Sequence, residues 1–164
     1  MRTTFGSDRA MQHRYLSISV ILAVVATVGV ARAAPPEVVT VVAKRGFVET
    51  VTGVEQAIEA HSLVRIATAS ASRAATSRGI KIPGNAVVLA FNNSYAVRLL
   101  SASVPAGIEA PMRFYVTENR DGLATISYRK PSAVLMPYSA EGLGELGREL
   151  DDLFAAIAAD AANR

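Results

Sequence analysis

The side chains best suited to hold a ligand lie on either side of one apolar segment. Asn92 and Asn93 directly follow that segment, and Arg73 and Arg78 lie shortly before it. Asparagine amides and arginine guanidiniums at a strand end can bind an anionic group through charge-assisted hydrogen bonds. The simpler interpretation is that the asparagines close a turn and the arginines keep the surface soluble. We treat these four residues as a candidate anion-binding set.

Glu49 is the fifth candidate, because a carboxylate such as that of Glu49 or Glu118 could complete a hydrolase-like site with asparagine and arginine. Its simpler role is a negative charge at the start of a helix. His61 is the one histidine after the N-terminal region, and a histidine-activated nucleophile would depend on it. We expect His61 to cap the end of a helix instead. A pocket that gathers Glu49, Arg73 and Asn93 would favour an enzyme, and a flat or filled surface there would count against it.

Metal and cofactor chemistry lacks its usual side chains in this sequence. The chain contains no cysteine and few histidines, so zinc or copper sites lack their common ligands. The glycine-rich loops that bind phosphates, G-x-x-x-x-G-K and G-x-G-x-x-G, are also absent. We expect no cofactor and no metal, and we favour a non-enzymatic protein.

The first 33 residues have the three parts of a secretory signal peptide. Three arginines precede an uncharged apolar stretch over 15–31, and a small-residue A-x-A sequence ends at Ala33. We predict cleavage after Ala33, a linker over 34–37 and a single periplasmic or secreted domain over 38–164. An uncleaved membrane anchor is the alternative, because the stretch approaches the length that spans a bilayer.

The charge balance argues against nucleic-acid binding once the signal is set aside. The chain has 17 Lys and Arg against 14 Asp and Glu. Four of the arginines and one aspartate fall within the signal, which leaves 13 basic and 13 acidic residues. A nucleic-acid-binding domain usually concentrates basic charge. The expected partners are a second copy of the chain, a small anionic ligand or an envelope protein, and a membrane only if the signal is retained.

The apolar pattern predicts alternating strands and helices. Strands are expected over 38–43, 63–68, 86–91, 112–117 and 123–129, and helices over 50–60, 70–78 and 140–162. Asp121-Gly122 predicts a hairpin between the last two strands. This order favours an α+β fold, a two-layer sandwich with an antiparallel-rich sheet and helices on one face.

Some details of these elements are less uniform. Thr52 and Glu55 have the spacing of a capping box for the first helix, although that helix could begin near Phe47. The continuous apolar run over 86–91 predicts a central strand buried on both faces. Residues 95–111 give mixed signals, and a loop or short irregular segment is expected over 131–137.

Short motifs also occur along the domain in a characteristic order. They are Phe47-Val48-Glu49-Thr50-Val51, Ile80 to Pro83, Val88 to Asn93, Ala110-Pro111-Met112, Tyr115 to Glu118 with Asp121-Gly122, and Ser127-Tyr128 with Pro131. This series resembles the family catalogued as domain of unknown function 302. The resemblance implies a β-α-β4-α plan similar to the TATA-box-binding-protein-like fold, often as a homodimer. It implies no DNA binding, and the family has no settled activity.

The chain departs from the family pattern at two places. Relatives tend to carry an Asp-His pair where this chain has Ser70-Ala71, and F-G-N-P where it has Phe91-Asn92-Asn93-Ser94. These departures favour a divergent member that binds without catalysis. We therefore prefer an exported domain that binds a small molecule or a protein partner as a homodimer. The leucine stripe of the last helix, which includes Leu150 and Phe154, could form either a dimer seam or a core.

Overall fold

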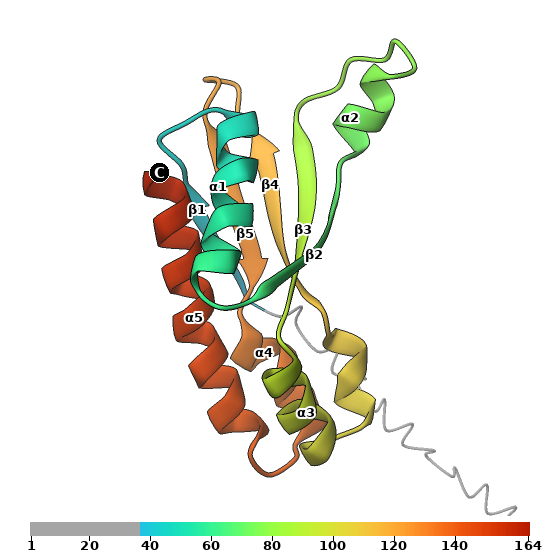
Figure 1. Cartoon of the computed structure of the whole chain (residues 1–164), viewed down its shortest axis with the longest axis vertical. Helices are drawn as coiled ribbons and strands as arrows, with labels where there is room; N and C mark the ends of the chain where they lie inside the picture. Colours follow the sequence, from blue (N-terminus) through green and yellow to red (C-terminus); the bar gives the residue numbers. More distant parts are fainter. Residues whose placement is uncertain (1–36) are drawn as a thin grey trace, which may run out of the picture. The chain divides into compact units, whose positions relative to one another are not determined.

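The computed structural model describes residues 37–164, which form a five-stranded sheet and its helices (Figure 1). The strands are β1 (Val38–Val42), β2 (Val64–Ala69), β3 (Asn85–Phe91), β4 (Met112–Glu118) and β5 (Ala124–Arg129). The helices are α1 (Phe47–Ala60), α2 (Ala71–Thr76), α3 (Asn93–Ala102), α4 (Pro131–Leu135) and α5 (Leu143–Asn163). Two 3₁₀ turns, η1 (Pro105–Glu109) and η2 (Met136–Tyr138), complete the domain. The predicted signal peptide and most of the predicted linker lie outside the described residues.

The sheet is antiparallel throughout, with the strand order β1-β5-β4-β3-β2. The main core is formed by buried side chains of α1 and α5 together with every second side chain of the central strands. The predicted two-layer α+β fold is therefore confirmed, and so is the β-α-β4-α plan, with α2, α3 and α4 as short additional helices. Among residues 37–164, no helix combines the length and apolar character needed to cross a membrane.

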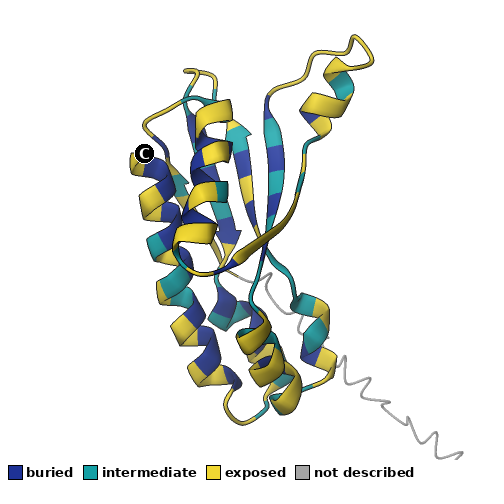
Figure 2. Ribbon diagram, viewed as in Figure 1, coloured by how far each residue is buried: buried dark blue, intermediate teal, exposed yellow. Residues whose placement is uncertain are grey.

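The strand β3 is central but not buried on both faces, so that prediction is wrong. Ala86, Val88 and Ala90 are buried, whereas the residues between them are only partly covered (Figure 2). Because successive side chains of a strand point to opposite faces, one set lies under the helices and the other on the outer face. The outer face of this sheet carries apolar side chains without a covering helix layer.

An aromatic cluster joins α5 to the middle of the sheet. The ring centroids of Phe114 and Phe154 are 4.6 Å apart, and those of Phe114 and Tyr128 are 5.5 Å apart. Leu150 and Phe154 are only 6% and 2% exposed. The leucine stripe of α5 is therefore core, and the alternative of a dimer seam is wrong for these two residues.

The first helix begins one turn earlier than the predicted capping box. It starts at Phe47, so Thr52 and Glu55 lie inside it, and Glu55 instead accepts a hydrogen bond from Thr68 of β2. Phe47 packs so closely on Gly84 that a Cβ atom there would lie 2.6 Å from the ring. The N–H of Gly84 also donates to Glu118 Oε2 at 2.7 Å. These motif residues therefore fix the fold at one end of β3.

The remaining elements follow local capping chemistry. Ser70 caps α2, with its hydroxyl accepting from the Arg73 N–H at 3.1 Å. The predicted hairpin is also present, because Asp121 Oδ1 accepts from the Leu123 N–H at 3.0 Å and Gly122 has φ of +84°. The region with mixed signals, 95–111, contains most of α3 and all of η1.

Candidate functional site

The predicted ligand-binding asparagine Asn92 is fully engaged in local structure. Its Oδ1 accepts hydrogen bonds from the N–H groups of Ser94 at 2.8 Å and Tyr95 at 3.4 Å, which caps α3. Its Nδ2 donates to the carbonyl of Ser62 at 2.9 Å, in the loop before β2. Asn93 is the first residue of α3 and is exposed. The turn interpretation therefore accounts for Asn92, in the form of a helix cap.

The structure does not bring the five predicted residues together. The N–H of Ala71 donates to Asn85 Oδ1 at 3.1 Å, which ties the start of α2 to the start of β3. Asn92 follows the other end of this seven-residue strand, roughly 20 Å away. Figure 1 shows α2 and α3 at opposite ends of the sheet. Arg73 is exposed on α2, and Arg78 is exposed beyond the end of that helix.

Glu49 and His61 mark the two ends of α1. Glu49 is exposed in the first turn, where a negative charge suits the helix dipole. His61 occupies the C-cap position as predicted, but its ring contacts another helix, with Nε2 2.7 Å from Asp160 Oδ2 of α5. Among residues 37–164, no group of three or more His, Asp or Glu side chains is placed to hold a metal ion.

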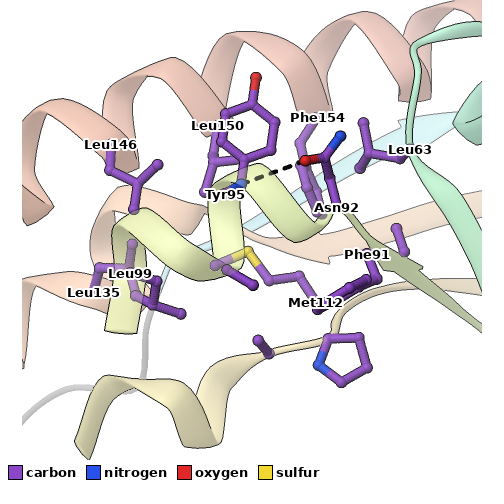
Figure 3. Close-up of a pocket in the computed structure, with 14 residues that line it drawn as sticks. Leu63, Phe91, Asn92, Tyr95, Leu99, Met112, Leu135, Leu146, Leu150 and Phe154 are labelled. Atoms are coloured by element: carbon purple, nitrogen blue, oxygen red, sulfur yellow. Dashed lines mark hydrogen bonds between the residues drawn. The ribbon is translucent and has the colours of Figure 1, made fainter. Parts of the chain in front are cut away.

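A small cavity lies under α3, and we call it the α3 cavity (Figure 3). Its volume is about 40 Å³, whereas ligand pockets usually measure several hundred Å³. Asn92 and Tyr95 supply polar atoms, and the other walls are apolar: Leu63, Ala90, Phe91, Ala96, Leu99, Ala110, Pro111, Met112, Leu135, Leu146, Leu150 and Phe154. The α3 cavity therefore has room for a water-sized molecule rather than for an organic ligand.

A polar cluster connects α3 to α5 beside this cavity. Arg98 Nη1 donates to Glu149 Oε2 at 2.7 Å, and the guanidinium lies 5.8 Å from the centre of the Tyr95 ring. The hydrogen bond from Arg98 lowers the pKa of Glu149. Burial raises the pKa of Tyr95, and the Glu149 carboxylate raises it further. The cluster stabilises the position of α3 without leaving a charged group free for a ligand.

A larger hollow lies where the outer face of the sheet meets η1 and α4, and we call it the outer groove. Its volume is about 270 Å³. It is lined by residues of β1, η1, β4, β5 and α4: Val38, Glu109, Met112, Arg113, Tyr115, Ser127, Tyr128, Arg129 and Val134. Glu49, Arg73 and Asn93 line neither this groove nor the α3 cavity. This geometry counts against the hydrolase-like site that would need all three.

Strand register places the polar side chains of the outer groove side by side. Tyr115 pairs with Ser127, and Phe114 pairs with Tyr128. One residue beyond the last pair of this ladder, Arg113 and Arg129 both line the groove. Because Phe114 and Tyr128 are buried beneath the helices, their neighbours in each strand point to the outer face. Two guanidiniums and two hydroxyls therefore occupy adjacent positions on that face.

The two arginines have no acidic partner within the described domain. Among residues 37–164, no carboxylate oxygen lies within 4.0 Å of either guanidinium. The carboxylate of Glu109, at the groove wall, instead accepts a hydrogen bond from the Tyr138 hydroxyl at 2.7 Å. This hydrogen bond raises the pKa of Tyr138. The outer groove thus combines two cationic groups with one carboxylate.

The sequence reasoning missed this arginine pair, because the pair depends on the register of the hairpin. A two-residue turn at Asp121-Gly122 would pair Arg120 with Leu123 and place Lys130, not Arg129, opposite Arg113. In the structure the Asn119 N–H instead donates to the Leu123 carbonyl and Glu118 pairs with Ala124, so the register differs by one residue. A shift of one residue changes which side chains share a face, so the turn motif alone could not locate the pair.

Comparison with known proteins gives a family and a fold. Residues 39–161 match the profile of the family described as domain of unknown function DUF302. A solved structure, the uncharacterized conserved protein DUF302 from Bacillus stearothermophilus, superposes with a TM-score of 0.68 at 19% identity. The alignment covers 77% of this chain and 98% of that one. No curated protein matches the sequence. Since the profile spans most of the chain, the protein belongs to the DUF302 family.

Proposed function

We propose that this protein is an exported, non-enzymatic domain that binds a small molecule in the outer groove. The observation that carries this proposal is the groove itself, whose volume of about 270 Å³ is just below the usual range for ligand pockets. Polar groups converge on its floor, and Val38, Met112 and Val134 supply apolar walls. Such a combination of shape and chemistry is typical of sites that bind small organic molecules.

The hydrolase alternative has less support from the geometry. Its expected groups are distributed over α1, α2 and α3 rather than around one reacting atom. The outer groove has a carboxylate, but no histidine or cysteine lines it. A binding role therefore fits the arrangement of side chains better than catalysis does.

Native mass spectrometry of the protein, purified gently from the envelope of the exporting cell, tests the proposal. We expect a reproducible extra mass that corresponds to a small molecule. Ser127→Trp should fill the floor of the groove and remove the extra mass. Thr117→Trp, on the same outer face but outside the groove lining, is the matched control and should retain it.

Two results would count against a small-molecule role. An empty mass for the wild-type protein would favour a protein partner, which crosslinking in the envelope would then identify. Retention of the ligand by Ser127→Trp would place the binding site elsewhere on the domain. Cell fractionation with N-terminal sequencing tests export separately, since we expect a soluble envelope protein that begins at Ala34.

We also propose that the protein forms a homodimer through the β2 edge of the sheet. The strand β2 has a neighbour on one side only, and Val64 and Ile66 are 57% and 50% exposed there. An exposed apolar edge strand can pair with another strand, and a lysine on it opposes such pairing. Ile66→Lys should therefore shift light-scattering mass from dimer to monomer. Val48→Lys, an exposed position on α1, is the control and should remain dimeric.

A further inference from the structure

We propose that the outer groove binds the oxyanion of a small organic acid through Arg113 and Arg129. This inference rests on the proposed small-molecule function and names the class of ligand. The shared chemistry is a carboxylate or phosphate group on a short carbon body. Arginine recognises such groups because its planar guanidinium donates two parallel hydrogen bonds to two oxygens.

The first argument is the cost of the arginine pair without a ligand. Side chains directly opposite each other on an antiparallel pair have Cβ atoms about 4.5–5.5 Å apart, and like charges at that spacing repel. Arg113 and Arg129 each lie one residue beyond the last pair of this ladder, Phe114 and Tyr128, and both line the groove. No carboxylate of residues 37–164 lies within 4.0 Å of either guanidinium. An anion bound between the two guanidiniums would remove this repulsion.

The second argument is the polar environment around the pair. Tyr115 and Ser127, which pair with each other one step of the outer face further along β4 and β5, line the same groove. Their hydroxyls can donate hydrogen bonds to oxyanion oxygens that the guanidiniums leave free. The site therefore presents two guanidinium groups and two hydroxyls, and all four side chains belong to two strands rather than to a loop.

The third argument concerns the remainder of the ligand. Glu109 adds a negative charge to the groove wall, and the Tyr138 hydroxyl donates to its carboxylate. The nearby Lys130 Nζ lies 3.6 Å from Glu37 Oε2, so the charges of these two side chains largely cancel. The net charge of the groove lining is thus positive by one, which suits a monoanionic acid whose carbon body contacts Met112 and Val134.

Isothermal titration calorimetry of the purified protein with three probes tests this inference. Hexanoate presents a carboxylate on an apolar body, hexanamide is its neutral counterpart, and inorganic phosphate presents an oxyanion alone. We expect hexanoate to bind at millimolar or lower concentration, with affinity that falls as salt rises, and hexanamide to bind much more weakly. Tighter binding of phosphate than of hexanoate would indicate a phosphorylated natural ligand.

Arg113→Gln and Arg129→Gln should each lower hexanoate affinity about tenfold or more, because each removes one guanidinium that would bind the carboxylate. Arg120→Gln, in the exposed turn of the same hairpin, should leave the affinity unchanged. Removing either groove arginine should also raise the thermal midpoint of the ligand-free protein slightly, since repulsion is relieved. A merely structural role would instead lower that midpoint.

Three outcomes would overturn the inference: groove variants that bind hexanoate as well as Arg120→Gln does, equal binding of hexanamide, or no binding of either oxyanion at millimolar concentration. Failure of this inference can be distinguished from failure of the proposed small-molecule function. A natural ligand that Ser127→Trp loses but Arg113→Gln and Arg129→Gln retain would leave the groove as a binding site and refute only the anionic class.

Discussion

The α3 cavity and the outer groove differ in the way their polar groups are used. In the α3 cavity, the Asn92 side chain accepts two hydrogen bonds and donates a third within the domain. In the outer groove, Arg113 and Arg129 have no acidic partner within residues 37–164. The first hollow is small and is enclosed by helices, loops and the ends of β3 and β4, whereas the second lies on the uncovered face of the sheet.

This difference shows which kind of polar residue indicates a site. Buried or half-buried polar groups normally find partners within the protein, so a polar side chain at a strand end is first explained by local structure. Charged groups that share a concave surface without partners have no such explanation. A polar side chain beside an apolar segment is therefore first explained as a cap, unless its contacts in the structure show another role.

Truncating a core side chain that lines the α3 cavity should cause the largest loss of stability among the substitutions proposed. Leu150→Ala removes a buried side chain of α5 and should lower the free energy of unfolding by about 2–5 kcal/mol. Urea denaturation measures this loss. Hexanoate affinity should remain at the wild-type value, because α5 covers the opposite face of the sheet from the outer groove. A parallel loss of affinity would mean that the two regions are coupled.

Substitution of the two neighbouring asparagines should give unequal losses of stability, and the larger loss should be of intermediate size. Asn92→Ala removes the cap of α3 and the hydrogen bond to Ser62, so we expect a loss of about 1–2 kcal/mol in the free energy of unfolding. Asn93→Ala, at an exposed position in the first turn of α3, should change stability by less than about 0.5 kcal/mol. Equal effects in the same denaturation experiment would show that the cap contributes little.

The smallest effect should come from the ion pair between α3 and α5. Because Arg98 lowers the pKa of Glu149 in the folded protein, the pair stabilises the fold at pH values above the ordinary pKa of a glutamate. This contribution is lost as the pH falls through the lowered folded value. Glu149→Gln should therefore be less stable than wild type near neutral pH, and the difference should shrink in acid.

A pH series of urea titrations measures that difference. Glu145→Gln, an exposed change in the first turn of the same helix, is the matched control. A gap between wild type and Glu149→Gln that stays constant down to strongly acidic pH would contradict the assignment. It would mean that the glutamine substitution acts through packing rather than through charge.

Most of the fold could be predicted from the sequence because its strands and two long helices have clear local signals. The hairpin at Asp121-Gly122 and the Ser70 cap follow from turn and capping chemistry alone. The helix α3 gave a mixed signal for a physical reason. Val97 and Leu100 are exposed while Leu99 is buried, so its apolar residues do not form one stripe.

The candidate site was harder to predict, because the contacts that decide it lie between elements. Thr52 and Glu55 have capping-box spacing, yet the packing of Phe47 on Gly84 starts the helix a turn earlier. Arg73 and Asn92 are both close to β3 in sequence, but they lie near opposite ends of this strand and are therefore far apart in space. Proximity along the chain therefore misled, and the turn motif alone predicts a register that places Lys130 rather than Arg129 opposite Arg113.

The pairing of β1 with β5 also determines when the domain can fold. The strand β1 is synthesised first, but its one neighbour in the sheet is the last strand to be made. The loop after β1 is in turn bonded to the end of α5, through the Lys44 N–H and the Ala162 carbonyl at 3.1 Å. Contacts between distant parts of a chain form slowly. The sheet therefore cannot be completed before β5 has been synthesised, and the hydrogen bond that joins the β1 loop to α5 requires nearly the whole chain.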